Sequence, residues 1–412
     1  MGWAVTQIYL QAHANLLDLF WEGFTMESYV QIDAHSVLIR LQPAADHLPC
    51  CSGCNQHTLA IHDTSTRRVR ERDLFHYRVW LDVPVRRVRC VSCGPRLEQI
   101  RWLPGRQRLT AGMINWIESL VRLMPVQHVA TLLGLHWHTV KAVDHQRLKR
   151  EVTEPDRHRI RRLIMDEFAL FKGHRYATVA IDADTQQVLW VGEGRSRAAV
   201  RPFFEWLGAE ACTRIEAVAM DMNTAMDLEV QHHCPNARVV YDLFHVVAKF
   251  GREVIDRVRV DQANQLRHDK PARKVVKRSR WLLLRNRTNL KDDQALKLEE
   301  LLQANQPLMT VYVLKDQLKE LWYAPSEDEA KQRWQDWLNL AMSSGLAPVQ
   351  QFARRLKGYV EGIIASAVYR MNTSVLEGMN NKIKVIKRMA YGYRDNDYFF
   401  LKIKAAFPGK VR

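Results

Sequence analysis

The spacing of apolar positions changes several times along the chain, and each change predicts a different kind of element. Residues 30–41 and the shorter run 77–83 alternate between apolar and polar side chains, which predicts β-strands with one buried face. Between residues 110 and 152 the apolar positions recur at helical spacing. A short apolar stretch at 16–20 lies in a lead segment that precedes these elements.

The second half of the chain has the pattern of a mixed sheet followed by helices. Strand-like runs are expected at 162–167, 176–182, 187–193, 215–220 and 237–242, with a helix at 198–207. Residues 250–360 have helical spacing throughout, and their expected apolar anchors are Trp281, Trp322, Trp334 and Trp337. A last long helix is expected from Thr373. This order predicts a multidomain α/β protein whose mixed sheet is interrupted by an all-helical insertion.

A helix-turn-helix is indicated within the helical stretch that follows the first strands. Pro125 suits the first position of a helix, Gly134 suits a tight turn, and Val140 continues the apolar face beyond that turn. Units of three such helices commonly place their last helix in the major groove of DNA. The side chains that would then face the bases are His136, His138, Thr139 and Lys141. A plain helical hairpin is the alternative interpretation.

The charge balance favours a polyanionic partner. Lys and Arg number 61 against 45 Asp and Glu, which gives a net charge of +16. Contacts with nucleic-acid phosphates are favourable because they release condensed counterions, although a merely basic protein would have the same balance. The excess gathers at 67–108, 270–287 and 382–394. The expected contacts to flanking or target DNA are Arg273, Lys274, Lys277, Arg278, Arg280, Asn381, Lys384, Lys387 and Arg388.

The apolar content sets limits on location. A hydrophobic share of 47% is ordinary for a globular protein, and the longest apolar runs are far too short to cross a bilayer. No charged leader followed by an apolar stretch begins the sequence. We therefore expect a cytoplasmic protein without a membrane partner, associated with the nucleoid when it is bound to DNA.

Cysteine spacing predicts a metal site near the N-terminus. Two CxxC pairs are formed by Cys51 with Cys54 and by Cys90 with Cys93. Four thiolates in two such pairs give the tetrahedral coordination of a structural zinc ion. Cys50 makes the first pair ambiguous, but only Cys51 leaves the two-residue gap. The alternative is a set of buried, unliganded thiols.

Three carboxylates are candidates for chemistry. Asp166 follows the apolar run 163–165, and Asp221 follows the apolar run 217–220, so both are expected at strand ends, where a ligand can reach them. Glu377 shares one polar helix face with cationic and amide side chains, and the opposite face of that helix is apolar, with Met379 and Ile383 among its residues. Two carboxylates that are held close together repel each other and gain from a bound divalent cation. Taken singly, each acid could equally be a turn residue or part of a solvated face.

Several segments carry a resemblance to a known family. The segment EGMNNKIKVIKRMAYGYR at 377–394 is similar to the signature of ISL-three family insertion-sequence transposases. Similar segments are MDEFA at 165–169, DMN at 221–223, PNARVVYDLFHV at 235–246 and SRWLLL at 279–284. The resemblance spans roughly residues 15–405.

The resemblance implies an RNase H-like catalytic domain with a DDE triad of Asp166, Asp221 and Glu377, which would bind two Mg²⁺ or Mn²⁺ ions. It also implies a structural or DNA-positioning role for the segment from Asp242 to His245. The implied order is a lead segment (1–45), a zinc ribbon (46–109), a helix-turn-helix (110–155), a first core part (160–250), a helical insertion (251–360), and a last core part with a basic tail (361–412). The expected partners are terminal inverted repeats, target DNA and a second copy of the chain, which would form a dimer.

Two other functions are compatible with the same modules. A regulator could use the zinc and helix-turn-helix modules to bind DNA without any catalysis. A metal-dependent nuclease could cut DNA without joining it. Only the transposase interpretation explains both the acidic triad and the whole order of domains.

Overall fold

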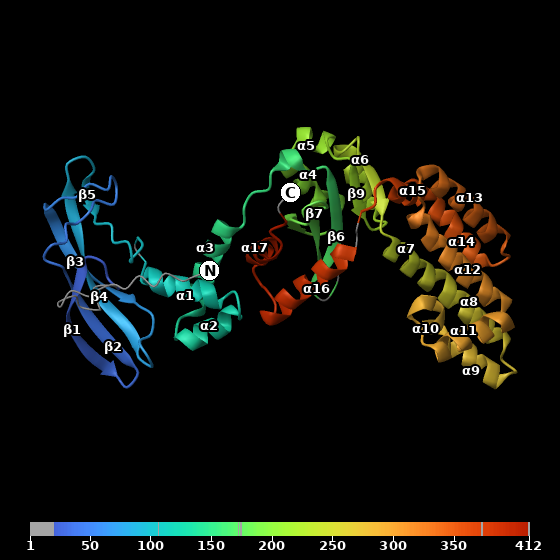
Figure 1. The fold of residues 1–412 in the computed structure, drawn as a ribbon, viewed down its shortest axis with the longest axis horizontal. Helices are drawn as coiled ribbons and strands as arrows, with labels where there is room; N and C mark the ends of the chain where they lie inside the picture. The colour runs from blue at the N-terminus through green and yellow to red at the C-terminus, as the bar shows by residue number, and fades with distance from the viewer. Residues whose placement is uncertain (1–19, 106, 172, 174, 372–373, 411–412) are drawn as a thin grey trace, which may run out of the picture. The chain divides into compact units, whose positions relative to one another are not determined.

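The computed structural model describes residues 20–105, 107–171, 173, 175–371 and 374–410 (Figure 1). All but Phe20 of the apolar stretch expected at 16–20, and the helix start expected at Thr373, lie outside these residues. The chain divides into two compact units, Met1–Lys149 and Arg150–Arg412, and each is described by itself. A search of the described helices finds none with both the length and the apolar character needed to cross a membrane.

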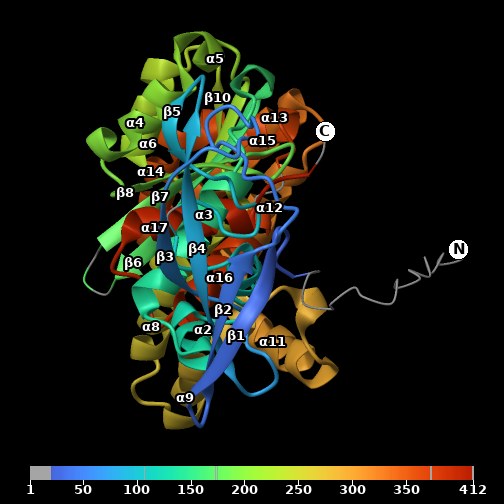
Figure 2. The ribbon, with the colours of Figure 1, turned by 90° about the vertical axis from the view of Figure 1, so that its left-hand side faces the viewer.

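The first unit begins with a five-stranded sheet. Its strands are β1 (Phe24–Asp33), β2 (Ser36–Pro43), β3 (Ile61–Arg70), β4 (Arg78–Cys90) and β5 (Gly94–Leu97). Their order is β1-β2-β4-β3, with β5 paired to one end of β4 (Figure 2). The prediction of a single strand over 30–41 was wrong, because the chain turns at residues 34–35. The backbone N–H of His35 donates to Asp33 Oδ1 at 2.7 Å and closes that turn.

Three helices complete the first unit: α1 (Ala111–Leu120), α2 (Val126–Leu133) and α3 (Trp137–Glu151). They share a core that includes Met113, Val129 and Val140. Gly134 ends α2 with a φ of 61°, the left-handed conformation that the turn prediction requires. Pro125 stands one position before the first helical residue rather than at it.

The second unit is built on a mixed sheet. β6 (Arg162–Phe171), β7 (Arg175–Asp182) and β8 (Val188–Glu193) form an antiparallel meander, and β9 (Ala217–Met220) and β10 (Arg238–Tyr241) add to it in parallel. The strand order is β10-β9-β6-β7-β8. The predicted α/β class is confirmed.

The prediction that Asp166 lies at the end of its strand was wrong. β6 continues to Phe171 because Phe168 and Leu170 keep the alternation of buried positions beyond Asp166. The parallel partner of β6 is shorter: β9 pairs only with residues 162–164. Asp166 therefore lies beyond the end of that pairing, where the neighbouring strand no longer covers it.

Helices cover both faces of this sheet (Figure 1). α4 (Arg197–Leu207), α5 (Ala209–Thr213) and α6 (Thr224–His233) pack on the face that includes Leu163, Met165 and Val218. α16 (Ser374–Met389) and α17 (Asn396–Ala406) pack on the other face, where Met379, Ile383 and Phe399 meet strand residues such as Ile164 and Val179. The apolar face expected for the Glu377 helix is thus the face that docks on the sheet.

In the chain, the helical insertion follows β10 and precedes α16. α7 (Leu243–Phe250) passes through one π-helical turn (Gly251–Ile255) into α8 (Asp256–Gln265). The remaining helices are α9 (Lys270–Arg278), α10 (Arg280–Leu284), α11 (Asp292–Ala304), α12 (Gln306–Glu320), α13 (Glu327–Ser343), α14 (Ala347–Leu356) and α15 (Val360–Val368), with a 3₁₀ turn, η5 (Leu321–Tyr323), after α12.

Three of the four tryptophans expected to anchor the insertion do so, and the fourth does not. Trp337 is buried and donates to Leu314 O at 2.9 Å, and half-buried Trp322 donates to Tyr241 O at 2.9 Å. Trp334 is also buried, as expected. Trp281, however, is 65% exposed, because in the short α10 it faces away from buried Leu283, two residues on.

Candidate active site and zinc centre

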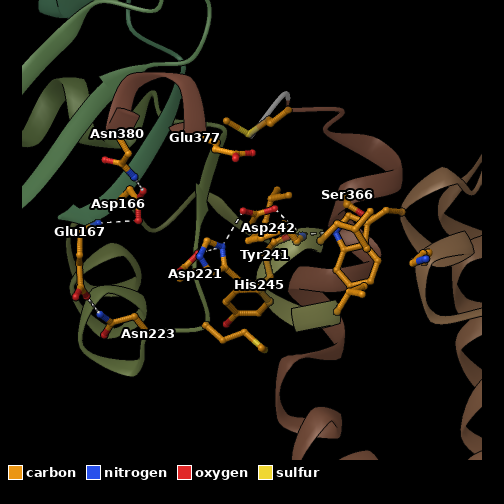
Figure 3. Close-up of a pocket in the computed structure, with 18 of the residues that line it drawn as sticks. Asp166, Glu167, Asp221, Asn223, Tyr241, Asp242, His245, Ser366, Glu377 and Asn380 are labelled. Carbon is orange, nitrogen blue, oxygen red and sulfur yellow. Dashed lines mark hydrogen bonds and ion pairs between the residues drawn. The ribbon is translucent and has the colours of Figure 1, made fainter. Parts of the chain in front are cut away.

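The three candidate acids line one cavity of about 1820 Å³ in the second unit (Figure 3). Ile164 of β6 pairs with Ala219 of β9, and the same offset carried two residues further places Asp166 beside Asp221. Glu377 comes from the first turn of α16, and its side chain points into the cavity. Three acidic side chains that are far apart in the sequence therefore line the same cavity.

Asp166 is held by two hydrogen bonds. Its Oδ2 accepts from Asn380 Nδ2 at 2.6 Å, and its Oδ1 accepts from the backbone N–H of Glu167 at 2.7 Å. Burial raises the pKa of the Asp166 carboxyl to about 6, and the negative charge of Asp221 acts in the same direction. Because Asn380 follows Glu377 by three residues on α16, the bond to Asp166 fixes the helix turn that carries the third acid.

Asp221 belongs to a second tight group, with Asp242 and His245. His245 Nδ1 lies 2.8 Å from Asp242 Oδ2, to which it hydrogen-bonds, and 2.6 Å from Asp221 Oδ1. The two carboxylates, Asp221 foremost, raise the pKa of His245 to about 10. Asp242 also caps α7 by accepting from the N–H of Phe244 at 2.9 Å.

The donor set at this edge of the sheet suits a divalent cation. Asp221 and Asp242 each offer a carboxylate oxygen, and these two oxygens lie within 4.8 Å of each other and of a ring nitrogen of His245. Asp221 Oδ1 is buried and lies within ion-pair distance of His245. It accepts no hydrogen bond of good geometry from the described residues. Carboxylate oxygens are the ligands that Mg²⁺ prefers. Asp166 and Glu377 line the same cavity, but neither of them is part of this closest group.

Only some of the predicted DNA contacts lie at this cavity. Asn381 and Lys384 line it beside Glu377. Lys387 instead donates to the backbone carbonyls of Leu170 and Ala169, so it holds the end of β6. Arg388 is exposed at the last turn of the same helix.

The cations predicted on α9 lie elsewhere in the second unit. Lys274, Lys277 and Arg278 are exposed, and Arg273 is half-buried. Arg280, at the start of α10, forms an ion pair with Asp256 at 2.9 Å. None of these five is among the described residues that line the cavity.

The cavity also contains residues outside the predicted triad. Glu167 accepts hydrogen bonds from Asn223 and from Arg195, the latter at 3.4 Å, and so links β6 to the starts of α6 and α4. Further polar lining residues are Arg285, Asn286, Asn289, Lys319, Arg370 and Asn380. Glu167, Asn223 and Asn380 lie in segments that carry the family resemblance. Sequence reasoning missed the polar residues that the insertion contributes, because no pattern in the sequence places them at the cavity.

The predicted cysteines come together in the first unit. The Sγ atoms of Cys51, Cys54, Cys90 and Cys93 all lie within 4.8 Å of one another. Thiolates bound at about 2.3 Å around a tetrahedral zinc ion lie about 3.8 Å apart, so the group fits that metal. The N–H of Gly53 donates to Cys51 Sγ and lowers the pKa of that thiol to about 7, which favours the thiolate that binds zinc. Cys50 is not part of this group of four.

The four residues predicted to face DNA bases are at the start of α3. His136 immediately precedes the helix and stacks on His138, with ring centroids 5.2 Å apart. Both histidines are exposed, and Thr139 and Lys141 are half-buried. Lys141 Nζ lies over the ring of Trp137, 5.4 Å from its centroid. The start of α3 thus offers polar and cationic groups of the kind that bind DNA.

A mixed sheet with acids from two adjacent strands and from a helix on its face, joined to a helix-turn-helix, is the arrangement of the DDE transposase class of enzymes. Comparison with known families agrees with this class. Residues 163–403 match a transposase family model of the ISL3 DDE type, and residues 98–148 match the helix-turn-helix domain of transposase family ISL3. Residues 47–93 match the zinc-finger of transposase IS204/IS1001/IS1096/IS1165. The chain belongs to the ISL3 family of transposases.

Individual relatives cover nearly the whole chain. The transposase for insertion sequence element IS1001 of Bordetella parapertussis is 54% identical over 395 residues, which is 95% of this chain and 97% of the relative. The transposase for insertion sequence element IS1557 of Mycobacterium tuberculosis is 26% identical over 386 residues, covering 88% of this chain and 86% of the relative.

Proposed function

We propose that the chain cuts DNA at the ends of an insertion sequence and joins the freed 3′ ends to target DNA, with Asp166, Asp221 and Glu377 as its catalytic acids. The observation that carries this proposal is the shared cavity, in which Asn380 bonds Asp166 from the helix that bears Glu377. The cavity is larger than the roughly 300–1000 Å³ of a small-molecule site, as a polymer substrate requires.

The three acids would hold two Mg²⁺ or Mn²⁺ ions. When bound, such ions would activate the attacking oxygen and neutralise charge on the leaving 3′ oxygen. The residues of the chain supply the geometry: Asn380 orients Asp166, and His245 keeps Asp221 and Asp242 close despite their like charges. Lys384 and Asn381, on the polar face of α16, would bind phosphates next to the cleaved bond.

The test replaces each acid by its isosteric amide. Asp166→Asn, Asp221→Asn and Glu377→Gln should each abolish cleavage of end DNA in Mg²⁺ while leaving DNA binding intact. Glu205→Gln, at an exposed position on α4 outside the cavity lining, is the matched control and should cut normally. Full strand joining by any one of the three amide variants would remove that acid from the site.

The same assay separates the alternative functions. A nuclease would give cut ends without joined products, and a non-catalytic regulator would give neither. We propose that the chain acts as a dimer, because joining requires two ends to be held together. The mass of the protein–DNA complex in solution tests this, and a complex with a single chain that still joins ends would contradict it.

We propose that the zinc ribbon and the helix-turn-helix recognise the terminal inverted repeats, with His136, His138, Thr139 and Lys141 near the bases and the cations of α9 on phosphates. A side chain that reads a base contributes about 1–3 kcal/mol of discrimination, whereas a phosphate contact acts on all sequences alike. His138→Ala should therefore reduce the preference for end DNA over unrelated DNA. Lys274→Ala should weaken both equally. An unchanged preference in the histidine variant would move recognition elsewhere.

A further inference from the structure

The wall of the cavity that the insertion supplies has a different chemistry from the acidic wall. It is lined by Arg285, Asn286, Asn289, Lys319 and Tyr323 from the insertion, together with Phe244 from the first turn of α7. Tyr323 is 72% exposed and Phe244 is 66% exposed, although both are large aromatic side chains. We call these six residues the aromatic wall. It combines stacking surfaces, amides and cations.

The aromatic wall is built next to the catalytic cluster. Phe244 packs edge-on against His245 with ring centroids 5.5 Å apart, and His245 in turn contacts Asp221. Trp322 donates to the carbonyl of Tyr241, so the 3₁₀ turn that carries Tyr323 lies alongside the end of β10. Asp242 follows Tyr241 directly. Both exposed rings are therefore anchored within a few residues of the acids.

The loop that carries the polar part of the aromatic wall is fixed from beneath. Lys315 is 1% exposed, and its Nζ donates to Leu283 O at 2.8 Å and to Arg285 O at 3.2 Å. One helical turn later, Lys319 donates to the side chain of Asn286. A buried ammonium group that holds two carbonyls is costly, and here it holds the segment that faces the cavity. Such a device preorganises a binding surface.

Paired DNA does not account for this surface. A duplex presents phosphates and sugars on its outside, which suit the cations, but its base faces are stacked away from the exposed rings of Tyr323 and Phe244. An unpaired base does present its face, and aromatic stacking on it is tolerant of sequence. Amides such as Asn286 and Asn289 can bond the Watson–Crick edge that unpairing exposes.

We propose that the aromatic wall binds a DNA nucleotide that is unpaired next to the cleaved bond, with its base stacked on Tyr323 and its phosphate near Lys319 and Arg285. This inference rests on the proposed function, because it assumes that the acids act on DNA in the same cavity. Unpairing costs a few kcal/mol. Stacking and the nearby cations offset that cost, and the nucleotide beside the acids is held in a defined position.

The test compares two DNA probes with the full-length zinc-loaded protein. One probe is a blunt duplex of an element end, and the other is the same duplex with a short thymidine tail at the cleavage position. Affinities are measured without added Mg²⁺, so that no cutting occurs. The wild-type protein should prefer the tailed probe. Tyr323→Ala should reduce that preference by about 5- to 150-fold, the range expected for one base–aromatic stack.

Two variants show whether the ring itself is responsible. Tyr323→Trp keeps a stacking surface and should restore the preference, which a merely structural role of the hydroxyl would not predict. Tyr29→Ala removes a tyrosine of equal exposure (71%) in the first unit and should leave the ratio of the two affinities unchanged. Because Tyr323 is exposed, its replacement leaves the core intact, and a thermal melt confirms this.

The outcomes separate this inference from the function on which it rests. Equal preference for the tailed probe in Tyr323→Ala and in the wild type overturns the inference, as does a wild-type protein with no preference for the tail. Asp166→Asn should keep the preference while losing cleavage. If Asp166→Asn still cuts DNA but Tyr323→Ala loses the tail preference, the assignment of the acids fails and the aromatic wall stands.

Discussion

Removal of zinc should unfold one end of the first unit and leave the rest folded, because that unit has separate cores. Around the four cysteines the buried apolar cluster contains only one other residue, Val88. The sheet core a few residues away on β4 is independent and includes Trp21, Phe24 and Leu81. We therefore expect metal removal to act locally.

The magnitudes support a local transition. Burial of one valine contributes about 1.5–3 kcal/mol, whereas structural zinc sites contribute about 10–16 kcal/mol of binding free energy to folding. The buried ion pair between Arg86 and Glu98, at 2.7 Å, adds little net stability in comparison with the zinc site, because both charges lose their hydration. Without the metal, the segments 47–57 and 90–97 have too little buried surface to stay ordered.

The assay is hydrogen exchange read by mass spectrometry, together with the zinc content of the chain. A chelator, or the variant Cys54→Ser, should abolish protection in 47–57 and 90–97 and preserve it in 79–85. Cys50→Ser is the matched control, because Cys50 lies outside the metal group and its loss should leave the zinc content unchanged. Unfolding of the whole sheet on chelation, or retention of zinc by Cys54→Ser, would refute the reasoning.

Two further predictions concern the second unit. Asn380→Ala removes a hydrogen bond to the Asp166 carboxylate that is worth about 1.5–3 kcal/mol, so the cleavage rate should fall by roughly tenfold to 150-fold with DNA binding kept; an unchanged rate under single-turnover conditions would contradict this. Burial lowers the pKa of Lys315 to about 8 from 10.5. Between these pH values the unfolded chain holds a proton that the folded chain has released, so the free energy of unfolding should rise with pH across this window. Lys315→Met should weaken that rise in denaturant melts, and an identical pH dependence in both proteins would exclude a buried, shifted lysine.

The parts of the molecule that follow from local pattern could be predicted from the sequence. The two CxxC pairs and the order of strands and helices are examples, since each depends on spacing within one segment. The apolar face of the Glu377 helix was also correct, because Met379 and Ile383 recur at helical spacing and both are buried on the sheet. Family resemblance supplied the link between the three acids, which no local pattern contains.

The features that depend on packing between distant segments could not be predicted. Lys315 and Trp322 look like ordinary helix residues, and their roles arise only because α12 meets the end of α10 and the end of β10. Lys387 looked like a DNA contact because it is basic and lies on a polar segment. It binds backbone carbonyls of β6, since docking of α16 brings that strand within reach. The length of β6 was underestimated because a charge at position 166 resembled a strand end.

The position of Glu377 late in the chain has a consequence for how the protein is synthesised. The unit Met1–Lys149 has its own cores and leaves the ribosome before the second unit, so it can fold long before α16 exists. A product that stops anywhere in the insertion would lack Glu377 and Asn380 but retain the helix-turn-helix. Each incomplete chain would then compete with finished enzyme for DNA. The fractional loss of transposition activity would therefore exceed the fraction of chains that are incomplete.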